Sequence, residues 1–452
     1  MSSSKFQITP GEVLIGSSSL NADGNKVDRV NYFLQHLPEN KLIQMSGLTG
    51  DDLEKNLAYH RERYLEYRKA WKEQPRLCIK NRWSEEELRA NRILPLCIDI
   101  EVAAICDLAC PFCHRQFIAT PDKLIKEELC FSLIDQAADL GVPSIKFNLR
   151  GEPLLHPRLP EFISYAKKRG VLETGINTNA THLTEKCAIK LIEAGLDLLI
   201  YSFDGGTKKT YEAMRPGRFR NNSFEAVYQN IKRFSEIRNE MGAFFPFTKI
   251  QMIMTKQTYP EIEDFFGLFS HCVDDVSVSQ YQERGGSLET LNTKHKHLYE
   301  KALADGSIGA GTPFRVDADD TFYLSRGRVP CEQPFQRLTV TYEGRVGMCC
   351  IDWGVSHLVG YADGLAFDND VHYKSVIDRV RDQKKGFDLL SEVSPMEVAN
   401  DLQHETQDLE SIWYGKAVQR VRESHYRNAV NDVNVCSKCT YVDTFDWEKI
   451  AH

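Results

Sequence analysis

The stretch ICDLACPFCH at residues 105–114 carries three cysteines, Cys106, Cys110 and Cys113, in the spacing C-x3-C-x2-C. Cysteine thiolates are the usual ligands of iron–sulfur clusters, and a [4Fe–4S] cluster normally takes four of them. The next cysteine, Cys130, lies well outside this cysteine loop, so three thiolates would leave one iron open to bind another molecule. A structural zinc site is the alternative, although zinc sites more often use paired C-x2-4-C knuckles that supply four ligands. The spacing therefore favours an iron–sulfur cluster with one open coordination position.

The composition of the 452-residue chain is that of a globular protein of two or three domains, with 42% hydrophobic and 27% charged residues. No apolar run approaches the length of a membrane span, and the first residues lack a secretion signal, so we expect a cytoplasmic protein with no membrane partner. The net charge of −8 gives no general attraction to nucleic acid. In a reducing compartment, 13 cysteines indicate metal ligation rather than disulfides.

Residues 95–285 alternate between short β-rich runs and amphipathic segments, after a region at 25–90 that has helical periodicity. Short strands separated by helices are typical of a parallel sheet with helices on its outside. The expected strands are Leu96–Val102, Ser144–Leu149, Glu173–Asn177, Leu198–Phe203, Lys249–Met254 and Val276–Tyr281. The expected helices lie near 127–140, 158–169, 184–194, 223–240 and 259–270. We therefore predict an α/β fold of six strand–helix units, in which chemistry collects at the C-terminal ends of the strands.

Polar motifs follow the expected strands at those ends. Arg150-Gly151-Glu152-Pro153 follows the second strand, and Asn177-Thr178-Asn179 ends the third. Ser202-Phe203-Asp204-Gly205 ends the fourth, and Arg215, whose guanidinium suits a carboxylate, comes shortly after it. Each motif alone also has an ordinary structural interpretation, such as a helix-start carboxylate at Glu152 or a turn residue at Asn179. Their order, each at a strand end, indicates a shared site with the cysteine loop.

The cysteine loop and this order of motifs resemble the radical S-adenosylmethionine (radical SAM) superfamily. In that family the loop holds a [4Fe–4S] cluster, and the amino and carboxylate groups of SAM chelate the open iron. The resemblance implies a partial (β/α)6 barrel and an enzyme in which one electron cleaves SAM to methionine and a 5′-deoxyadenosyl radical. That radical then abstracts a hydrogen atom from the substrate, and the electron comes from a donor such as flavodoxin or ferredoxin. The cofactor supplies the reactive species, while the protein binds, orients and excludes water.

The resemblance also implies roles for residues at the strand ends. Phe112 matches the aromatic residue beside the adenine, and Gly151 with Glu152 matches the family's Gly-Gly-Glu at the SAM amino group. Arg150 stands where the first glycine is common, so the chain departs from the family at this backbone contact. Further cofactor contacts are expected from Asn177, Asn179, Ser202, Asp204 and Arg215.

A second cysteine set lies in the C-terminal part of the chain. Cys331 is followed by Gly344 and Cys349 in the pattern C-x9-15-G-x4-C, and Cys436 and Cys439 form a later C-x2-C. This pattern resembles the SPASM and twitch extensions of radical SAM enzymes, and four cysteines fit the shorter twitch arrangement with one auxiliary [4Fe–4S] cluster. Closed ligation by four thiolates suits an electron carrier. A zinc ribbon is the structural alternative.

Two details of the cysteine assignment stay open. Cys350 adjoins Cys349 and is an alternative ligand, although the glycine spacing favours Cys349. Most of the remaining cysteines are expected to be small buried hydrophobes. Some radical SAM epimerases return a hydrogen atom from a thiol, so Cys187 and Cys272 are candidate hydrogen donors.

We expect three parts: a helical N-terminal extension at 1–94, the barrel at 95–285, and a linker with a small α+β auxiliary-cluster domain at 286–452. Residues 64–71 resemble the lead-in of radical SAM proteins associated with sugar metabolism, and the helical region shows no winged-helix pattern. This resemblance implies oxidation, dehydration or epimerisation of a small polar substrate such as a sugar, nucleotide sugar or aminocyclitol. The alternatives are a maturase of a ribosomally made peptide and a non-catalytic iron–sulfur scaffold or sensor.

Overall fold

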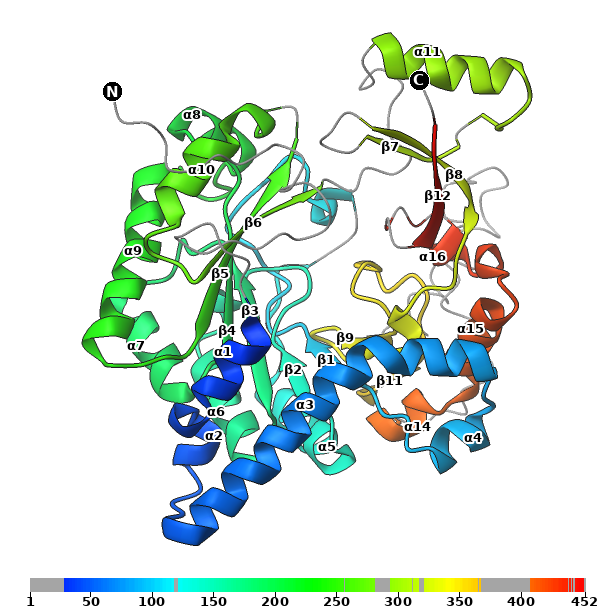
Figure 1. Ribbon diagram of the computed structural model, residues 1–452. Coiled ribbons are helices and arrows are strands. Elements are labelled where there is room, and N and C mark those ends of the chain that lie inside the picture. Colours follow the sequence, from blue (N-terminus) through cyan, green and yellow to red (C-terminus); the bar gives the residue numbers. More distant parts are fainter. Residues whose placement is uncertain are drawn as a thin grey trace, which may run out of the picture.

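The computed structural model describes most of the chain, and its elements are arranged as in Figure 1. The described residues are 28–117, 121–255, 257–280, 293–310, 312–316, 321–364, 366, 407–437, 439, 441 and 444–450. The first helices are α1 (Arg29–Gln35), α2 (Lys41–Gln44), α3 (Gly50–Asn81) and α4 (Glu85–Ala90). None of the described helices is both long enough and apolar enough to cross a bilayer.

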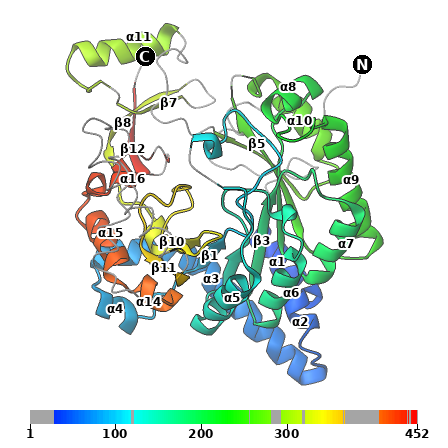
Figure 2. The same cartoon turned by 180° about the vertical axis from the view of Figure 1, so that it is seen from behind.

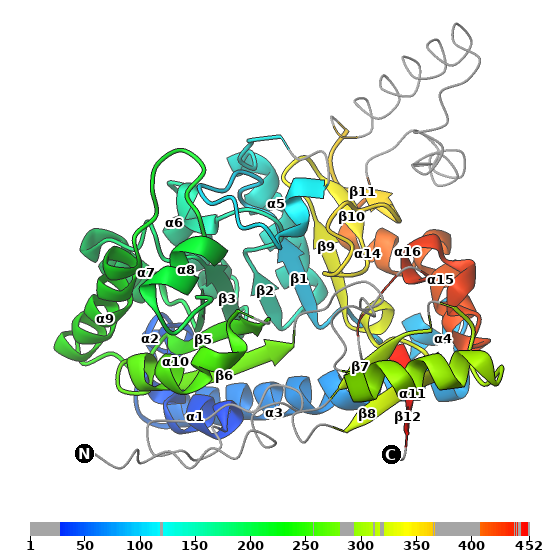
Figure 3. The same cartoon turned by 90° about the horizontal axis from the view of Figure 1, so that it is seen from above.

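Six parallel strands form the barrel sheet in the order of the sequence, from β1 to β6. These strands are β1 (Cys97–Ile100), β2 (Ser144–Lys146), β3 (Glu173–Thr178), β4 (Leu198–Ser202), β5 (Phe247–Met254) and β6 (Asp275–Gln280). The helices that follow them are α5 (Glu127–Leu140), α6 (Leu159–Lys168), α7 (Glu185–Ala194), α8 (Lys208–Met214), α9 (Phe224–Glu240) and α10 (Ile262–Phe269). Viewed from above, α5, α6, α7 and α9 lie around the outside of the strands (Figure 3). The sheet is therefore the expected partial (β/α)6 barrel.

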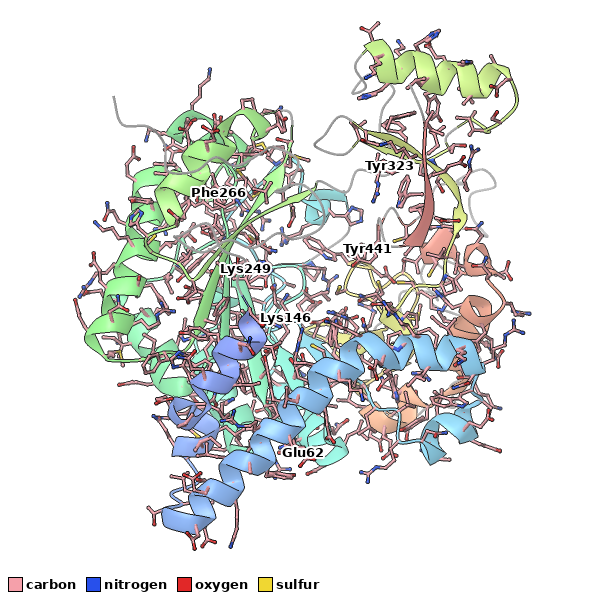
Figure 4. The ribbon with its side chains drawn as sticks, in the orientation of Figure 1. Glu62, Lys146, Lys249, Phe266, Tyr323 and Tyr441 are labelled. Atoms are coloured by element: carbon pink, nitrogen blue, oxygen red, sulfur yellow. The ribbon has the colours of Figure 1, made fainter. Side chains whose placement is uncertain are left out.

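The barrel strands are apolar on the outer face and polar on the inner face. Ile98 and Ile100 of β1 belong to the main hydrophobic core, which also contains residues of the outer helices. Side chains alternate along a strand, so Asp99 points to the opposite face, beside its in-register neighbour Lys146 of β2. On β5, Lys249 pairs with Asp275 of β6 at 3.0 Å. Figure 4 labels Lys146 and Lys249 toward the middle of the molecule.

The N-terminal helices are anchored to the barrel by buried polar contacts. The hydroxyls of Tyr64 and Tyr67, both on α3, donate to the Glu173 carboxylate at 3.2 and 3.4 Å. Asp197 accepts hydrogen bonds from Lys167 at 2.9 Å and from the Asn40 side chain at 2.6 Å. The 32-residue helix α3 runs from beneath the barrel to the C-terminal part of the chain (Figure 1).

The C-terminal part contributes strands to the barrel sheet and also forms a small sheet of its own. β9 (Arg337–Val340) pairs in parallel with β1, and β10 (Arg345–Gly347) and β11 (Gly360–Tyr361) continue the sheet beyond it. Gly344 makes the turn between β9 and β10 with φ +95°, a conformation that favours glycine. The alternation between residues 95 and 285 does not predict this extension.

The small sheet lies apart from the barrel, as the reverse view shows (Figure 2). Its strand order is β12-β8-β7, with β7 (Phe314–Val316), β8 (Phe322–Arg328) and β12 (Phe445–Lys449). The helices of this part are α11 (Thr293–Ala304), α14 (Leu409–Trp413), α15 (Lys416–Tyr426) and α16 (Asn434–Ser437). The expected domain boundaries at 94/95 and 285/286 stay predictions, and residues 281–292 around the second lie outside the described residues.

Candidate active site

The cysteine loop leaves the end of β1 and is held against the segment that follows α8. The Ala109 N–H donates to the Pro216 carbonyl at 2.8 Å, and the Arg218 N–H donates to the Asp107 carbonyl at 2.7 Å. Within the loop, the Cys113 N–H donates to the Cys110 carbonyl at 3.0 Å. Backbone contacts from two directions thus fix the path of the loop.

The three loop thiols form a donor set that fits an iron–sulfur cluster. Cys110 is buried, and Cys106 and Cys113 are half-buried. Burial raises the pKa of Cys106 to about 12 and that of Cys110 to about 11, so both are protonated at neutral pH until a metal displaces the protons. The Asn179 side-chain amide lies 3.9 Å from the Cys106 sulfur, where a ligand thiolate would accept a hydrogen bond.

Asp107 connects the loop to the end of β3, a role that the sequence motifs did not reveal. Its carboxylate accepts hydrogen bonds from the Asn179 amide at 2.8 Å and the Thr181 hydroxyl at 2.6 Å, and His182 lies 3.4 Å away. Burial opposes ionisation, but these hydrogen bonds outweigh it and lower the pKa of Asp107 to about 2. The sequence feature that could have indicated this contact is the presence of a carboxylate inside the cysteine loop.

Gly151 packs directly on the backbone that leads into the cysteine loop. A Cβ atom at this position would lie 2.1 Å from the Ala103 carbonyl oxygen and 2.4 Å from the Ile105 carbonyl oxygen. The next residue, Glu152, donates its N–H to the same Ile105 oxygen at 2.9 Å. Only glycine fits this close approach.

Glu152 is 2% exposed, and its carboxylate ties its own loop to the end of β3. It accepts hydrogen bonds from the Thr178 hydroxyl at 2.7 Å, the Asn179 N–H at 2.8 Å and the Leu154 N–H at 3.0 Å. Burial raises the pKa of Glu152 to about 7 in spite of these donors. The carboxylate therefore positions the end of β3, and its expected contact with the SAM amino group stays a prediction.

Arg150, which stands in place of a common family glycine, forms a buried ion pair. Its guanidinium donates to the two Glu101 carboxylate oxygens at 2.6 and 2.5 Å. One of these oxygens also accepts the Tyr342 N–H at 3.1 Å, from the turn between β9 and β10. The pair thus joins the second strand–helix loop to β1 and to the C-terminal hairpin.

Arg215 has a carboxylate partner within the chain itself. Its Nε and Nη2 lie 2.8 and 2.7 Å from the same oxygen of Asp204, whose other oxygen accepts the Ile253 N–H at 2.6 Å. The guanidinium also lies 5.9 Å from the centre of the Phe112 ring. The structure thus brings three of the expected cofactor-contacting residues, Phe112, Asp204 and Arg215, to one place beside the cysteine loop.

Two further expected residues lie at the ends of neighbouring strands. Asn177 is on β3, where its side-chain oxygen is buried and has no hydrogen-bond partner within the described part of the chain. Ser202 ends β4, half-buried and in register with Gln251 of β5. An unpartnered buried oxygen fits a site where a bound molecule supplies the donor.

The two candidate hydrogen donors lie among the outer helices. Cys187 is in the first turn of α7 and lines a surface pocket with Leu154 and His156. Cys272 follows α10, and its thiol donates to the Phe269 carbonyl at 3.6 Å. Burial and the Glu152 carboxylate raise the pKa of the Cys187 thiol, and the role of both thiols as hydrogen donors stays a prediction.

The four C-terminal cysteines line one cavity. Cys331, Cys349, Cys436 and Cys439 all contribute to its wall, together with His425. The Ile351 N–H donates to the Cys349 sulfur at 3.3 Å, and the Tyr441 N–H donates to the Cys439 sulfur at 3.4 Å. Tyr441 is labelled in Figure 4 between the barrel and the small sheet. Four thiols with amide donors around one cavity fit a cluster held by four cysteines.

Cys350, the alternative ligand, is bonded to Gln333, which is itself a lining residue of the cavity. Its thiol donates to the Gln333 side-chain oxygen at 3.5 Å, and Cys350 does not line the cavity. The position of Cys349 on the cavity wall therefore favours it as the ligand. Among the described residues, no three His, Cys, Asp or Glu side chains converge as a single metal ion requires.

His425 is the residue of this cavity that the cysteine spacing did not reveal. It is 1% exposed at the end of α15, and its two ring nitrogens face Cys331 and Cys436. Burial, with a smaller effect of Arg328, lowers the pKa of His425 to about 4, so the ring is neutral at pH 7. No local pattern around residue 425 points to this role.

Comparisons with known proteins agree with the site. A family model described as the radical SAM superfamily matches residues 100–269. A tungsten-containing aldehyde ferredoxin oxidoreductase cofactor-modifying protein of Pyrococcus furiosus is 27% identical over 170 residues, which are 36% of this chain and 45% of that protein. A probable GTP 3′,8-cyclase of Methanothermobacter marburgensis is 34% identical over 268 residues, 56% of this chain and 83% of that protein.

Among solved structures, Streptococcus suis SuiB bound to precursor peptide SuiA aligns with a TM-score of 0.47 at 14% identity, over 87% of this chain and 80% of that one. This chain spans less than half the length of the Pyrococcus relative and most of the length of the Methanothermobacter relative. The chain belongs to the radical SAM superfamily, a family that uses a [4Fe–4S] cluster and S-adenosylmethionine.

Proposed function

We propose that this enzyme oxidises a small, polar, carbohydrate-like substrate by two electrons and that an auxiliary [4Fe–4S] cluster accepts one of them. The observation that carries the proposal is the cavity lined by Cys331, Cys349, Cys436 and Cys439. Ligation by four protein thiolates leaves no iron open to a substrate, so such a cluster acts as an electron acceptor.

The reaction balances without an external oxidant. SAM and one electron give methionine and the 5′-deoxyadenosyl radical, which takes a hydrogen atom from a carbon that bears a hydroxyl group. The resulting carbon radical loses one electron and one proton to become a carbonyl. Each cycle takes up one electron and returns one electron, so the net reaction consumes one SAM and releases one proton. The reductant is needed to start the cycle and is not consumed by it.

The chain's own residues bind and orient these groups. Cys106, Cys110 and Cys113 would hold the first cluster, which supplies the electron that cleaves SAM when it is bound. Asn179 would donate to the Cys106 sulfur, and Gly151 lets the second loop pack on the cysteine loop. The Asp204–Arg215 pair fixes the segment beside Phe112. Together these contacts hold the cysteine loop against the ends of β2, β3 and β4.

The inner face of the barrel supports a polar substrate. It carries Lys146, the Lys249–Asp275 pair and the unpartnered oxygen of Asn177. Hydroxyl-rich molecules suit such a surface because they satisfy buried polar groups with hydrogen bonds.

The N-terminal extension offers an argument against a peptide substrate. Its described part, residues 28–94, is helical and contains no strand that a bound peptide would extend. Tyr64 and Tyr67 of the 64–71 segment donate to Glu173, so these residues stabilise the barrel. Peptide maturation stays the alternative, and dehydration or epimerisation stay alternative outcomes for the substrate radical.

The test uses the reconstituted full-length enzyme, SAM and dithionite, with aminocyclitols, free sugars, nucleotide sugars and synthetic precursor peptides as trial substrates. We expect a product two mass units lighter, formed one-for-one with 5′-deoxyadenosine. The control is the cysteine-loop variant, in which Cys106, Cys110 and Cys113 are all alanine and from which 5′-deoxyadenosine should be absent. A product that gains one deuterium at carbon in D2O would show epimerisation, and a modified peptide would show that the substrate class is wrong.

A further inference from the structure

His425 lies between two of the four cavity cysteines. The Cys331 N–H donates to His425 Nδ1 at 2.9 Å. On the other side of the ring, Nε2 lies 3.8 Å from the Cys436 sulfur. The Phe335 ring packs edge-on against the imidazole, with a distance of 6.5 Å between the ring centres. The ring is therefore held from three sides.

The contact with Cys331 determines which nitrogen carries the proton. A backbone N–H is only a donor, so Nδ1 must present its lone pair to it. The proton of the imidazole is then on Nε2, which faces Cys436. A thiolate has no proton of its own and accepts a hydrogen bond. The Nε2–H of His425 and the Cys436 sulfur therefore form a donor–acceptor pair when Cys436 is a metal ligand.

We propose that His425 donates a hydrogen bond from Nε2 to the ligand sulfur of Cys436 and thereby raises the reduction potential of the auxiliary cluster. The inference rests on the proposed function, because it assumes that the four cysteines hold an iron–sulfur cluster. His425 is a positioning residue, because it touches the ligand sulfur and not the substrate.

The direction of the effect follows from charge. A reduced cluster carries one more negative charge than an oxidised one, and part of this charge lies on the ligand sulfurs. A hydrogen bond to a charged acceptor is stronger than one to a less charged acceptor, so the donor stabilises the reduced state more. A higher potential makes the cluster a better acceptor for the electron of the substrate radical.

Two features make His425 the residue to change. The donors at Cys349 and Cys439 are backbone amides, which substitution leaves in place, whereas the donor at Cys436 is a side chain. Arg328 adds positive charge nearby, because its guanidinium donates to the Cys436 carbonyl and to the Thr444 hydroxyl.

Two substitutions test the roles of the two imidazole nitrogens separately. His425→Asn places an amide oxygen near the position of Nδ1, so it keeps the acceptor for Cys331 and removes the donor to Cys436. His425→Gln places an amide nitrogen near the position of Nε2, so it keeps the donor to Cys436. Both are made in the full-length cysteine-loop variant, so that the auxiliary cluster gives the only iron–sulfur signal in the EPR spectrum.

The readout is an EPR-monitored redox titration, with iron and zinc measured on the same samples. We expect His425→Asn to lower the ratio of reduced to oxidised cluster about tenfold at the parent's midpoint potential, a shift of about 59 mV for a one-electron couple. We expect the auxiliary cluster of His425→Gln to have the same midpoint potential as that of the parent protein. In the parent, pulsed EPR with 15N-labelled histidine should show a nitrogen coupling to the reduced cluster.

The outcomes distinguish this inference from the proposed function. About four irons per chain with an unchanged midpoint in His425→Asn would overturn the role of His425 and leave the cluster in place. Stoichiometric zinc without iron would overturn both. If His425→Asn binds no iron, the pulsed EPR measurement on the parent protein tests the proposal. The absence of a histidine nitrogen coupling in that spectrum would refute the hydrogen bond.

Discussion

Removal of Arg150 from its buried pair with Glu101 should destabilise the enzyme strongly at neutral pH. The side chains of Arg150 and Glu101 are 6% and 0% exposed, and two hydrogen bonds of 2.6 and 2.5 Å join them. In Arg150→Met, the Glu101 carboxylate keeps the Tyr342 N–H at 3.1 Å and loses its counter-charge. Breaking a buried pair in this way costs about 3–5 kcal/mol.

Urea denaturation at pH 7 measures this loss. With an m value of about 3 kcal/mol/M, the midpoint of Arg150→Met should fall by about 1–1.7 M. In the double variant with Glu101→Gln, the loss should be smaller than the sum of the two single losses, because neither buried charge remains. The control is Lys55→Met, which removes an exposed pair with Asp52 and should change stability by less than about 0.5 kcal/mol. A loss below about 0.5 kcal/mol at pH 7 would refute the reasoning.

Three other predictions test the site and the fold. Cys349→Ala should lower the iron content from about eight to about four per chain, whereas Cys350→Ala should keep about eight, and the reverse result would assign the ligand to Cys350. Gly151→Ala should prevent 5′-deoxyadenosine formation, because its Cβ would meet the Ala103 and Ile105 carbonyl oxygens; activity equal to wild type would contradict this packing. Burial, with Arg63 nearby, lowers the pKa of His60 to about 4 from its usual value near 6.5. The unfolded chain therefore binds the extra proton first, and stability should fall as the pH drops from about 6.5 to about 4. In His60→Gln this part of the acid sensitivity should be missing from urea titrations.

The elements of the barrel could be predicted from the sequence because each depends on local patterns. The helix expected at 127–140 has the same bounds in the structure, where two glutamates occupy its first turn and Gly141 ends it with φ +86°. The strand expected at 144–149 ends earlier, at Lys146, because the side chain of Asn148 bonds to the N–H of Asn177 on β3 instead of continuing the strand. Helix α8 is not among the helices expected from the sequence.

The partners of the site residues could not be predicted, because they are far apart in sequence. Glu101 and Arg150 are 49 positions apart, and Cys331 and His425 are 94 apart. The cysteine spacing indicates the ligands, because loop ligands are close in sequence. It gives no information on a histidine or carboxylate that another element brings to them.

The pairing of β9 with β1 is the long-range contact with the largest consequence for function. β1 leads into the cysteine loop, and the β9–β10 hairpin leads into Cys349 on the wall of the auxiliary cavity. Both segments belong to one hydrogen-bonded sheet, and the Arg150–Glu101 pair and the Tyr342 N–H join them again at the turn of the hairpin. A sheet of this kind is rigid, so backbone pairing fixes the separation between the two cysteine sets. Electron transfer between a substrate radical and a second cluster requires such a fixed separation. For this reason a change at the Arg150–Glu101 pair should weaken the coupling of SAM cleavage to product, in addition to its effect on stability.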